Sequence, residues 1–485
     1  MPMSNTYRGH PLMIFSFLKP FLFVLVIPVI KGLLQYLIYG RISGVISFEI
    51  YLFAAILLIA VARWLSFSVV HTDKSLTINS GMIFKSHAKI SLDKLSCFSQ
   101  TVNPILKLCG AASFEVNTEA GGRENADFNF ILKSDDAIKL SSFVYGEAGN
   151  PVIKYSNPKI AMFSVSSSSA LTGIIVAAPI INRAGKLLNI AITEMILDEI
   201  DTFSNRFMKY FPPAVTALTV IVVLAFGISF IISFLKNLTF RLRVDENRME
   251  TSSGLLSRKR TVFSKTAVNN TVIVQTPIMR FFKNYSMYAT VGGFGTQRSE
   301  KAVIIPCGKH REIKSEFRTY FPFLQRDSKP LKASQSSRSL KRFLWLAKFY
   351  GALIIAASIT LMIIFRHFDR FVLFVASMAL LVDLYYADLC KCNYLHGGLS
   401  IGDNIGAKGA KGFNFCEMNC DKTKIGVIKI TETLPDRRYG TCKVKMTVRS
   451  ESAYGITVKN LNKSEVLKAL NEAYGVSKAI SYIPE

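Results

Sequence analysis

The chain has 485 residues, half of them hydrophobic, and its mean hydropathy is +0.30. It also carries 59 Lys and Arg against 33 Asp and Glu, a formal net charge of +26. A purely soluble protein of this length is seldom this apolar, whereas this many charged residues need contact with water. The composition therefore indicates a membrane protein with substantial soluble parts.

Six apolar segments predict membrane-spanning helices. Crossing the hydrocarbon takes about 20 helical residues, and five of the segments are long enough. The sixth is shorter and contains Asp383, but it completes a third pair of segments. Glu49 and Asp383 both lie near predicted ends, which favours interfacial positions. The six segments are residues 13–39, 48–66, 160–181, 211–235, 343–365 and 371–386.

Six crossings would place both termini and every soluble region on one side of the membrane. Basic residues gather beside the predicted spans on that side, as they do on the cytoplasmic side of membrane proteins. We therefore expect a multi-pass protein of the cell membrane with cytoplasmic termini and soluble domains. The basic residues beside the spans are Lys236, Arg241, Arg243, Arg338, Lys341 and Arg342.

The soluble regions share an internal spacing. A glycine, a proline 23 residues later and a basic residue three positions after the proline occur three times. In the first two copies Phe67 and Phe240 precede the glycine by 14 residues. Such a repeat indicates a triplication, with the prolines at equivalent positions just after a strand and the basic residues beginning the next turn. The repeated residues are Gly81, Pro104 and Lys107, then Gly254, Pro277 and Arg280, then Gly412, Pro435 and Arg438.

These patterns predict an α+β membrane protein in which each of three helix pairs is followed by an antiparallel β domain with a C-terminal helix. Alternating polar and apolar residues predict the strands. The closing helices are predicted to begin after Ser134, near Arg311 and after Asn462, a good N-cap. The expected regions are helix pairs at 1–66, 160–235 and 343–386, and soluble domains at 67–159, 236–342 and 387–485.

The sequence resembles the bacterial pleckstrin-homology-like domains that are flanked by membrane helices. In the first copy the resemblance is carried by Leu76-Thr77-Ile78-Asn79-Ser80-Gly81, Lys89-Ile90-Ser91-Leu92-Asp93-Lys94-Leu95 and Gln100-Thr101-Val102-Asn103-Pro104-Ile105-Leu106-Lys107. In the second copy it is carried by Ser252-Ser253-Gly254-Leu255-Leu256 and Gln275-Thr276-Pro277-Ile278-Met279-Arg280. The third copy departs from the pattern at Tyr439-Gly440 and in its glycine- and lysine-rich residues 402–412.

The resemblance to this family implies a strongly bent antiparallel sheet closed by a helix. It also implies a non-catalytic membrane role, as a scaffold or in envelope stress, with cytosolic domains that bind lipid or protein. A shorter membrane protein with a single such domain is a partner that the resemblance suggests.

Positive charge is concentrated in the central soluble region. Residues 236–342 hold 22 Lys and Arg against 7 Asp and Glu, a net charge of +15. Such charge near an anionic leaflet favours binding to anionic lipid, although it could also serve only orientation and solubility. No aromatic RNA-binding signature accompanies it, so no nucleic-acid partner is predicted. The residues predicted to bind the lipid surface are Arg258, Lys259, Arg260, Arg338, Lys341 and Arg342.

Motifs of catalysis are missing from the sequence, so no enzyme activity and no cofactor are predicted. The segment 406–412 lacks the Gly-Lys-Ser/Thr ending of a phosphate loop, which favours a flexible hairpin whose lysines could touch lipid phosphates. Cys390, Cys392, His396, Cys416 and Cys420 form the one metal-like cluster of the sequence. The spacing of Cys416 and Cys420 would be tolerable for structural zinc, but Cys390 and Cys392 are too close together, so no metal is predicted.

Two further features leave alternatives open. Residues 182–210 carry apolar residues at helical spacing and acids on other faces, which predicts an amphipathic helix outside the membrane. This helix either packs on the flanking spans or receives an external partner. The competing function is a transporter or lipid-handling protein, which would need charge deep within the spans.

Overall fold

The computed structural model describes residues 5–21, 45–72, 74–81, 85–118, 127–145, 152–169, 213–292, 301–326, 328–332, 337–365, 369–448 and 454–475. The predicted amphipathic helix at 182–210 lies outside these residues, as do most of the spans predicted at 13–39 and 160–181. The described part is a mixed α+β fold in which every strand pairing is antiparallel.

Domain 1 consists of four strands, three further strands and a closing helix. The first four strands form one sheet in the order β1-β2-β3-β4. Helices α1 and α3 lie between β1 and β2 in the chain. The elements are β1 Asn5–Arg8, α1 Met13–Leu18, α3 Val45–Leu65, β2 Ser68–Thr72, β3 Ser75–Ser80, β4 Ser86–Ser91, β5 Leu95–Val102, α4 Pro104–Leu108, β6 Ala111–Thr118, β7 Phe128–Lys133 and α5 Ser134–Tyr145.

Domain 2 repeats this plan, with α6 and α9 between its first and second strands. Its elements are β8 Val152–Lys154, α6 Asn157–Ser167, α9 Pro213–Asn237, β9 Arg241–Val244, β10 Arg248–Ser253, β11 Arg258–Ser264, β12 Val268–Gln275, α10 Pro277–Phe281, β13 Asn284–Val291, β14 Ala302–Lys309, α11 His310–Tyr320 and the 3-10 turn η3 Pro322–Leu324.

Domain 3 follows the same order, with α12 and α13 after its first strand. Its elements are β15 Leu331–Lys332, α12 Ser337–Ile364, α13 Asp369–His396, β16 Gly398–Ser400, β17 Asn404–Lys411, β18 Asn414–Asp421, β19 Ile425–Thr431, α14 Leu434–Tyr439, β20 Thr441–Val448, β21 Tyr454–Asn462 and α15 Lys463–Tyr474.

The first strand of each domain precedes its helices in the chain, which differs from the domain boundaries expected from the sequence. Those boundaries put β8 at the end of one soluble region and β15 at the end of the next. The structure pairs β8 with β9 and β15 with β16 instead. A strand of two or three residues carries no periodic pattern, and its partner in the sheet follows only after the inserted helices.

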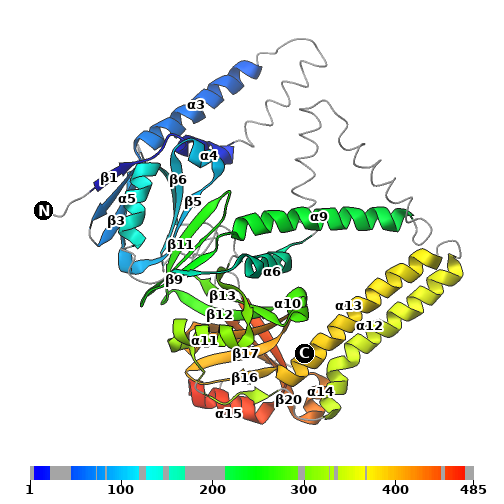
Figure 1. Ribbon diagram of the computed structural model, residues 1–485. Coiled ribbons are helices and arrows are strands. Elements are labelled where there is room, and N and C mark those ends of the chain that lie inside the picture. Colours follow the sequence, from blue (N-terminus) through cyan, green and yellow to red (C-terminus); the bar gives the residue numbers. More distant parts are fainter. Residues whose placement is uncertain are drawn as a thin grey trace.

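Neighbouring domains share their sheets. The three-stranded sheet of domain 1 continues through β5 and β11 into the four-stranded sheet of domain 2, and β12 and β18 join domains 2 and 3 in the same way. The hydrophobic cores cross these joints, because Val262 of β11 packs in the core of domain 1 and Val272 of β12 packs in that of domain 3. Two continuous seven-stranded sheets therefore run through the molecule (Figure 1).

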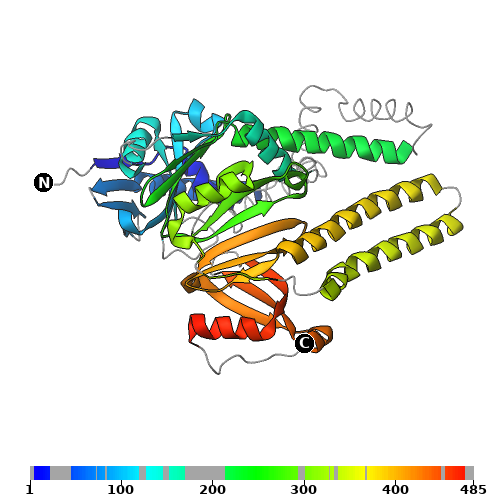
Figure 2. The ribbon, with the colours of Figure 1, turned by 60° about the horizontal axis from the view of Figure 1, so that its bottom comes forward.

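Three of the described helices are long and apolar enough to cross a membrane. They comprise Thr219–Asn237 of α9, Leu340–Ile364 of α12 and Asp369–His396, the whole of α13. The stretch Tyr51–Leu65 of α3 is apolar but shorter. Helices α9, α12 and α13 project from the sheets toward the same side in both views (Figures 1 and 2). The structure thus supports membrane association through these helices, whereas six spans in three pairs stay a prediction.

The predicted closing helices are present in all three domains. Helix α5 begins at Ser134, α11 extends to Tyr320, and α15 follows Asn462, whose side-chain oxygen accepts a hydrogen bond from the Ser464 amide at 3.1 Å. Buried side chains on one face of each helix attach it to its domain. In α15 these are Val466 and Leu470, spaced four residues apart as the helical period requires.

Candidate membrane-contacting site

A short helix follows the first strand of each three-stranded sheet, and it contains the repeated proline. Pro104 begins α4 and Pro277 begins α10, a position where the missing amide hydrogen of proline costs no hydrogen bond. Pro435 is the second residue of α14. The equal sequence interval in the third copy therefore does not correspond to the same helical position. One residue separates Gly412 from β18, compared with three between Gly254 and β11 and four between Gly81 and β4.

The repeated glycines adopt positive φ angles at hairpin turns. The φ angles are +99° at Gly81, +106° at Gly254 and +60° at Gly412. At Gly254 a Cβ would also lie 2.0 Å from the Ser257 carbonyl oxygen. These turns therefore require glycine, which explains why the sequence repeats it.

Each short helix exposes large apolar side chains. In α4 the exposed fractions are 71% for Ile105 and 89% for Leu108, and in α10 Phe281 is 83% exposed. In α14 Leu434 is 77% exposed. Large exposed side chains on the corresponding short helix of all three domains favour contact with a nonpolar environment, because exposing apolar surface to water costs roughly 25 cal/mol per Å².

The repeated basic residues lie in the same short helices, near their ends, and do not begin a separate turn. Lys107 in α4 and Arg438 in α14 are exposed beside the apolar side chains. Arg280 in α10 instead forms an ion pair with Asp388 of α13, with 2.8 Å between Nη2 and Oδ2. This contact places α10 beside the domain-proximal end of a membrane-length helix, and Figure 1 shows α14 next to the corresponding end of α12.

A cavity of about 410 Å³ lies where α12 and α13 meet domain 3. Its lining combines apolar residues of the two helices with polar groups of the domain. Lys443 of β20 and Lys459 of β21 line it, and within the described residues no carboxylate forms an ion pair with either ammonium group. Asn393 of α13 adds an amide. Two ammonium groups and an amide beside apolar helices suit an anionic group at the end of an acyl chain.

The cavity also contains an ion pair that is already complete. The guanidinium of Arg342 binds the carboxylate of Asp436, which is buried and also accepts hydrogen bonds from the Thr433 amide at 2.9 Å and the Thr441 hydroxyl at 3.2 Å. Burial alone would raise the pKa of Asp436, but the hydrogen bonds from Thr433 and Arg342 and the charge of Arg342 hold that pKa below its ordinary value. Asp436 is therefore a carboxylate, and Arg342 is committed to it.

The basic residues predicted to bind lipid in β11 have different positions. Arg260 pairs with Glu250, with 2.5 Å between Nε and Oε1, and Glu250 also pairs with Arg243 at 3.2 Å. Arg258 is an exposed residue of the same strand. Lys259 lines a second cavity, of about 590 Å³, between α6, α9 and the sheet shared by domains 1 and 2. Sequence proximity thus did not bring these three charges to one surface.

The basic residues predicted to bind lipid at the start of α12 likewise have different environments. Lys341 is exposed, Arg342 is bound to Asp436, and the side chain of Arg338 lies outside the described residues. The described side chains among the six residues predicted to bind lipid therefore do not gather on one surface, and their binding to lipid stays a prediction.

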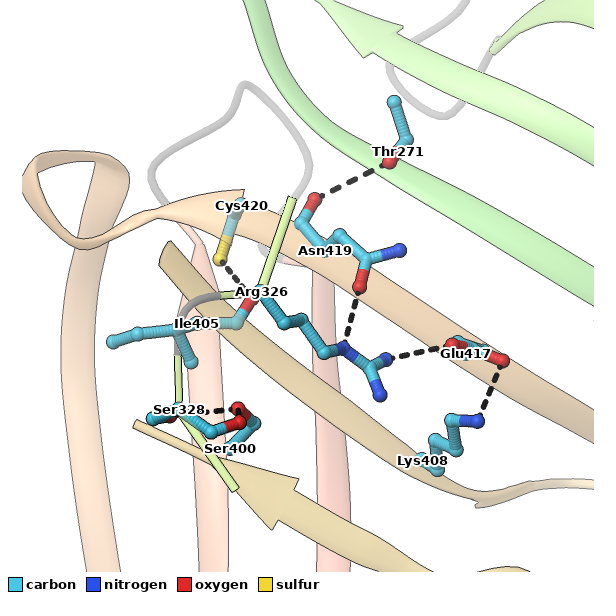
Figure 3. Close-up of polar contacts among 9 residues, drawn as sticks. All are labelled: Thr271, Arg326, Ser328, Ser400, Ile405, Lys408, Glu417, Asn419 and Cys420. Carbon is cyan, nitrogen blue, oxygen red and sulfur yellow. Dashed lines mark hydrogen bonds and ion pairs between the residues drawn. The ribbon is translucent and has the colours of Figure 1, made fainter. Parts of the chain in front are cut away.

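An ion-pair network fastens the segment between domains 2 and 3 to the outer face of β17 and β18 (Figure 3). Arg326 donates from Nη2 to Glu417 Oε1 at 2.8 Å and from Nε to Asn419 Oδ1 at 2.9 Å. Lys408 lies 3.0 Å from the other oxygen of Glu417. Burial would raise the pKa of Glu417, but the charges of Arg326 and Lys408 keep that pKa below its ordinary value.

This network also corrects the interpretation of the glycine-rich segment. Residues 406–411 belong to strand β17, the first arm of a hairpin with β18 that turns at Gly412, so the predicted hairpin is present but is held in a sheet. Lys408 is bound to Glu417 rather than available to a lipid phosphate. Ser328 and Ser400 complete the attachment through their hydroxyl groups, 2.8 Å apart. Within the described part of the chain, no group of three His, Cys, Asp or Glu side chains could hold a metal ion.

Sequence reasoning missed the cavity residues because they come from separate elements. Asn393, Lys443 and Lys459 lie in α13, β20 and β21 and share no motif. The exposed apolar residues of the short helices did have a signal, since Ile105 and Leu108 flank the repeated basic residue Lys107.

Repeated bent β domains, each closed by a helix and interrupted by apolar helices after its first strand, define a membrane-associated protein of pleckstrin-homology-like domains. A family model described as "Bacterial PH domain" matches residues 17–148 and 196–318, together more than half of the chain. The chain therefore belongs to the bacterial PH domain family. Comparisons with the curated proteins and with the solved structures found no match.

Proposed function

We propose that this protein is a multi-pass membrane scaffold whose three PH-like domains contact the bilayer surface and bind anionic lipid headgroups. One observation carries the proposal. Each domain presents a short helix with exposed apolar residues, on α4, α10 and α14, and in α4 and α14 these residues lie beside an exposed basic one. Apolar side chains that enter the interface, with cations at headgroup level, are how peripheral segments bind membranes.

The cavity at α12 and α13 supports the second part of the proposal. It lies at the ends of two membrane-length helices, so an acyl chain could follow Phe343 and Leu346 while its headgroup meets Lys443 and Lys459. A basic residue near an anionic leaflet contributes about 1 kcal/mol. In this proposal the soluble domains are cytoplasmic, the protein lies in the cell membrane, and its role is non-catalytic, as in envelope stress.

A groove between α12 and α13 favours the alternative of a transporter or lipid-handling protein. It has a volume of about 560 Å³ and is lined by apolar residues together with Asp383. The carboxylate faces Gly351, where a Cβ would lie 2.9 Å from Oδ2. A carboxylate in an apolar groove is a usual feature of transport paths, but one such residue does not make a path across the described helices.

The insertion of the short helices is tested with single tryptophans in the full-length protein. Trp64 and Trp345 are first replaced by Phe, and L108W or L434W is then added to protein in bilayers that contain brominated lipids. We expect strong quenching of both new tryptophans and little quenching of I138W, because Ile138 is exposed on α5, the closing helix of domain 1. Equal and weak quenching at all three positions would contradict insertion.

Headgroup binding is tested by native mass spectrometry of the full-length protein after exchange into phosphatidylglycerol or phosphatidylcholine. The variant K443Q K459Q should lose retained phosphatidylglycerol relative to wild type. Lys445, an exposed neighbour on β20, provides the matched control K445Q. Retention that is the same in all proteins, or the same for both lipids, would refute the anionic site and leave the insertion of the short helices to its own test.

A further inference from the structure

The joints between domains 1 and 2 and between domains 2 and 3 are built in the same register. In the first joint Thr261 of β11 pairs with Ser99 of β5, and in the second Met418 of β18 pairs with Val272 of β12. Thr261 and Met418 each lie three residues before the end of their strand, and Ser99 and Val272 each lie four residues after the start of theirs. The same relationship between strands is therefore used twice.

Each of the two outermost domains has one strand that is equivalent to a joint strand but lies at the edge of its sheet. Strand β4 of domain 1 is equivalent to β11 and β18, and strand β19 of domain 3 is equivalent to β5 and β12. Both lie at the edge of a sheet, and among the described residues no strand pairs with the outer edge of either. The chain thus ends in two complementary sheet edges, one at each end of the domain row.

Local details confirm that β19 is the equivalent strand. An irregularity interrupts the pairing of β5 with β6 between Leu95 and Cys97, and the same irregularity occurs in β19 between Ile425 and Val427. Cys97, which faces the neighbouring domain across the first joint, is 1% exposed. Val427 holds the equivalent position and is 59% exposed. An apolar side chain that is covered at one joint is therefore uncovered at the free edge.

The shared register specifies how the free edges would meet. It places Ala88 opposite Lys429 and Ile90 opposite Val427, so the exposed valine would lie against a core residue of domain 1. No two lysines are brought opposite each other, because Lys89 would lie opposite Ile428. The free edges are therefore compatible in length, register and charge.

We propose that copies of this chain associate head to tail in the membrane, with β19 of one copy paired with β4 of the next. The occupant is a second copy because both halves of the joint belong to this chain and already join its own domains twice. Such an interface is heterologous, so it continues into a ring or an open row. Helices of successive copies project to the same side, as α9, α12 and α13 do within one chain (Figure 2).

The proposal is tested by disulfide crosslinking in native membranes between two differently tagged full-length chains. One chain carries A88C and the other K429C, in a background in which the exposed Cys109 is Ser. The equivalent side chains, Ser99 and Thr261, lie 2.9 Å apart between their hydroxyl oxygens, so oxidation should link the two tags. A chain that carries both substitutions should give a ladder of linked copies.

The matched control pairs A88C with I428C, because a shift of one residue turns the side chain to the opposite face of the strand. Melting curves of every variant in detergent establish that it is folded. Folded variants that give no linked species would overturn the proposal. So would equal linkage in the control pair, or linkage of A88C only to a different membrane protein, since each shows that the edge does not meet a second copy in this register.

Discussion

The Nε atom of Arg326 occupies the place where a side chain at Gly406 would begin, since a Cβ there would lie 2.0 Å from Nε. The guanidinium therefore rests directly on strand β17. From that position it reaches both Glu417 and Asn419 of β18 (Figure 3). The absence of a side chain at Gly406 thus decides how the segment after domain 2 is attached to domain 3.

Replacing Gly406 by Ala should displace Arg326 and leave Glu417 with one of its two cationic partners. Removing one partner of a buried ion pair costs about 3–5 kcal/mol, so we expect the lower end of that range as a loss of unfolding free energy. The measurement is the melting temperature of the full-length protein in detergent. G227A provides the control, because a Cβ at Gly227 would have no atom within 4 Å apart from the backbone of its own helix. A smaller loss for G406A in an R326A background would show that the two residues are coupled.

Protonation of Glu417 should weaken the same attachment at low pH. Its pKa in the folded protein is lowered from the ordinary value of 4.5, so its contribution is complete above about pH 4.5 and is lost as the pH falls through the lowered pKa. E417Q should therefore be much less stable than wild type at pH 7, and the difference should narrow progressively below pH 4.5. A difference that does not change with pH would contradict the assignment.

Substitution of Arg342 should lower the stability of the protein rather than act mainly on lipid binding, because Arg342 is bound to Asp436. R342Q leaves the buried Asp436 without its cation, and a lost hydrogen bond to a charged group costs about 1.5–3 kcal/mol. K341Q removes the same charge from an exposed neighbour and should change the melting temperature little. Equal melting temperatures for the two variants would show that the ion pair contributes nothing.

Replacing Lys283 by glycine should stabilise the protein. It has a φ of +54° two residues after the end of α10, and Gly110 and Gly440 have φ angles of +61° and +62° just after α4 and α14. A left-handed conformation costs an L-residue roughly 1–2 kcal/mol. We expect K283G to raise the unfolding free energy by up to about 1 kcal/mol and G440A to lower it by a similar amount. A loss of stability in K283G would mean that contacts of the lysine outweigh the strain.

Both termini and all three domains should lie on the cytoplasmic side. Single cysteines at the exposed positions Ser91, Ser315 and Thr423 report on domains 1, 2 and 3 in a background without Cys109. A membrane-impermeant maleimide should label them only after the membrane is opened. Labelling of any one of them in intact cells, or of a cysteine at Ser336, would contradict the common orientation.

Sequence alone determined much of the local structure, because local structure depends on nearby residues. Periodicity and capping residues located the closing helices at Ser134 and Asn462, and the repeated glycines marked turns whose φ angles only glycine adopts easily. The family resemblance was confirmed by the match to the bacterial PH domain. Long apolar runs identified α9 and α12 as membrane-length helices, whereas α13 was predicted from the repeat of helix pairs because its apolar run is shorter.

Only the tertiary structure decided how these parts combine. Strands β8 and β15 pair with β9 and β16, which follow only after an intervening pair of helices, and no local pattern records such a pairing. The charges of Arg260 and Arg342 look available in the sequence but are bound to Glu250 and Asp436, which are distant in the chain or on another strand. Pairing between edges and between charges depends on the relative positions of whole elements, and packing of the cores sets those positions.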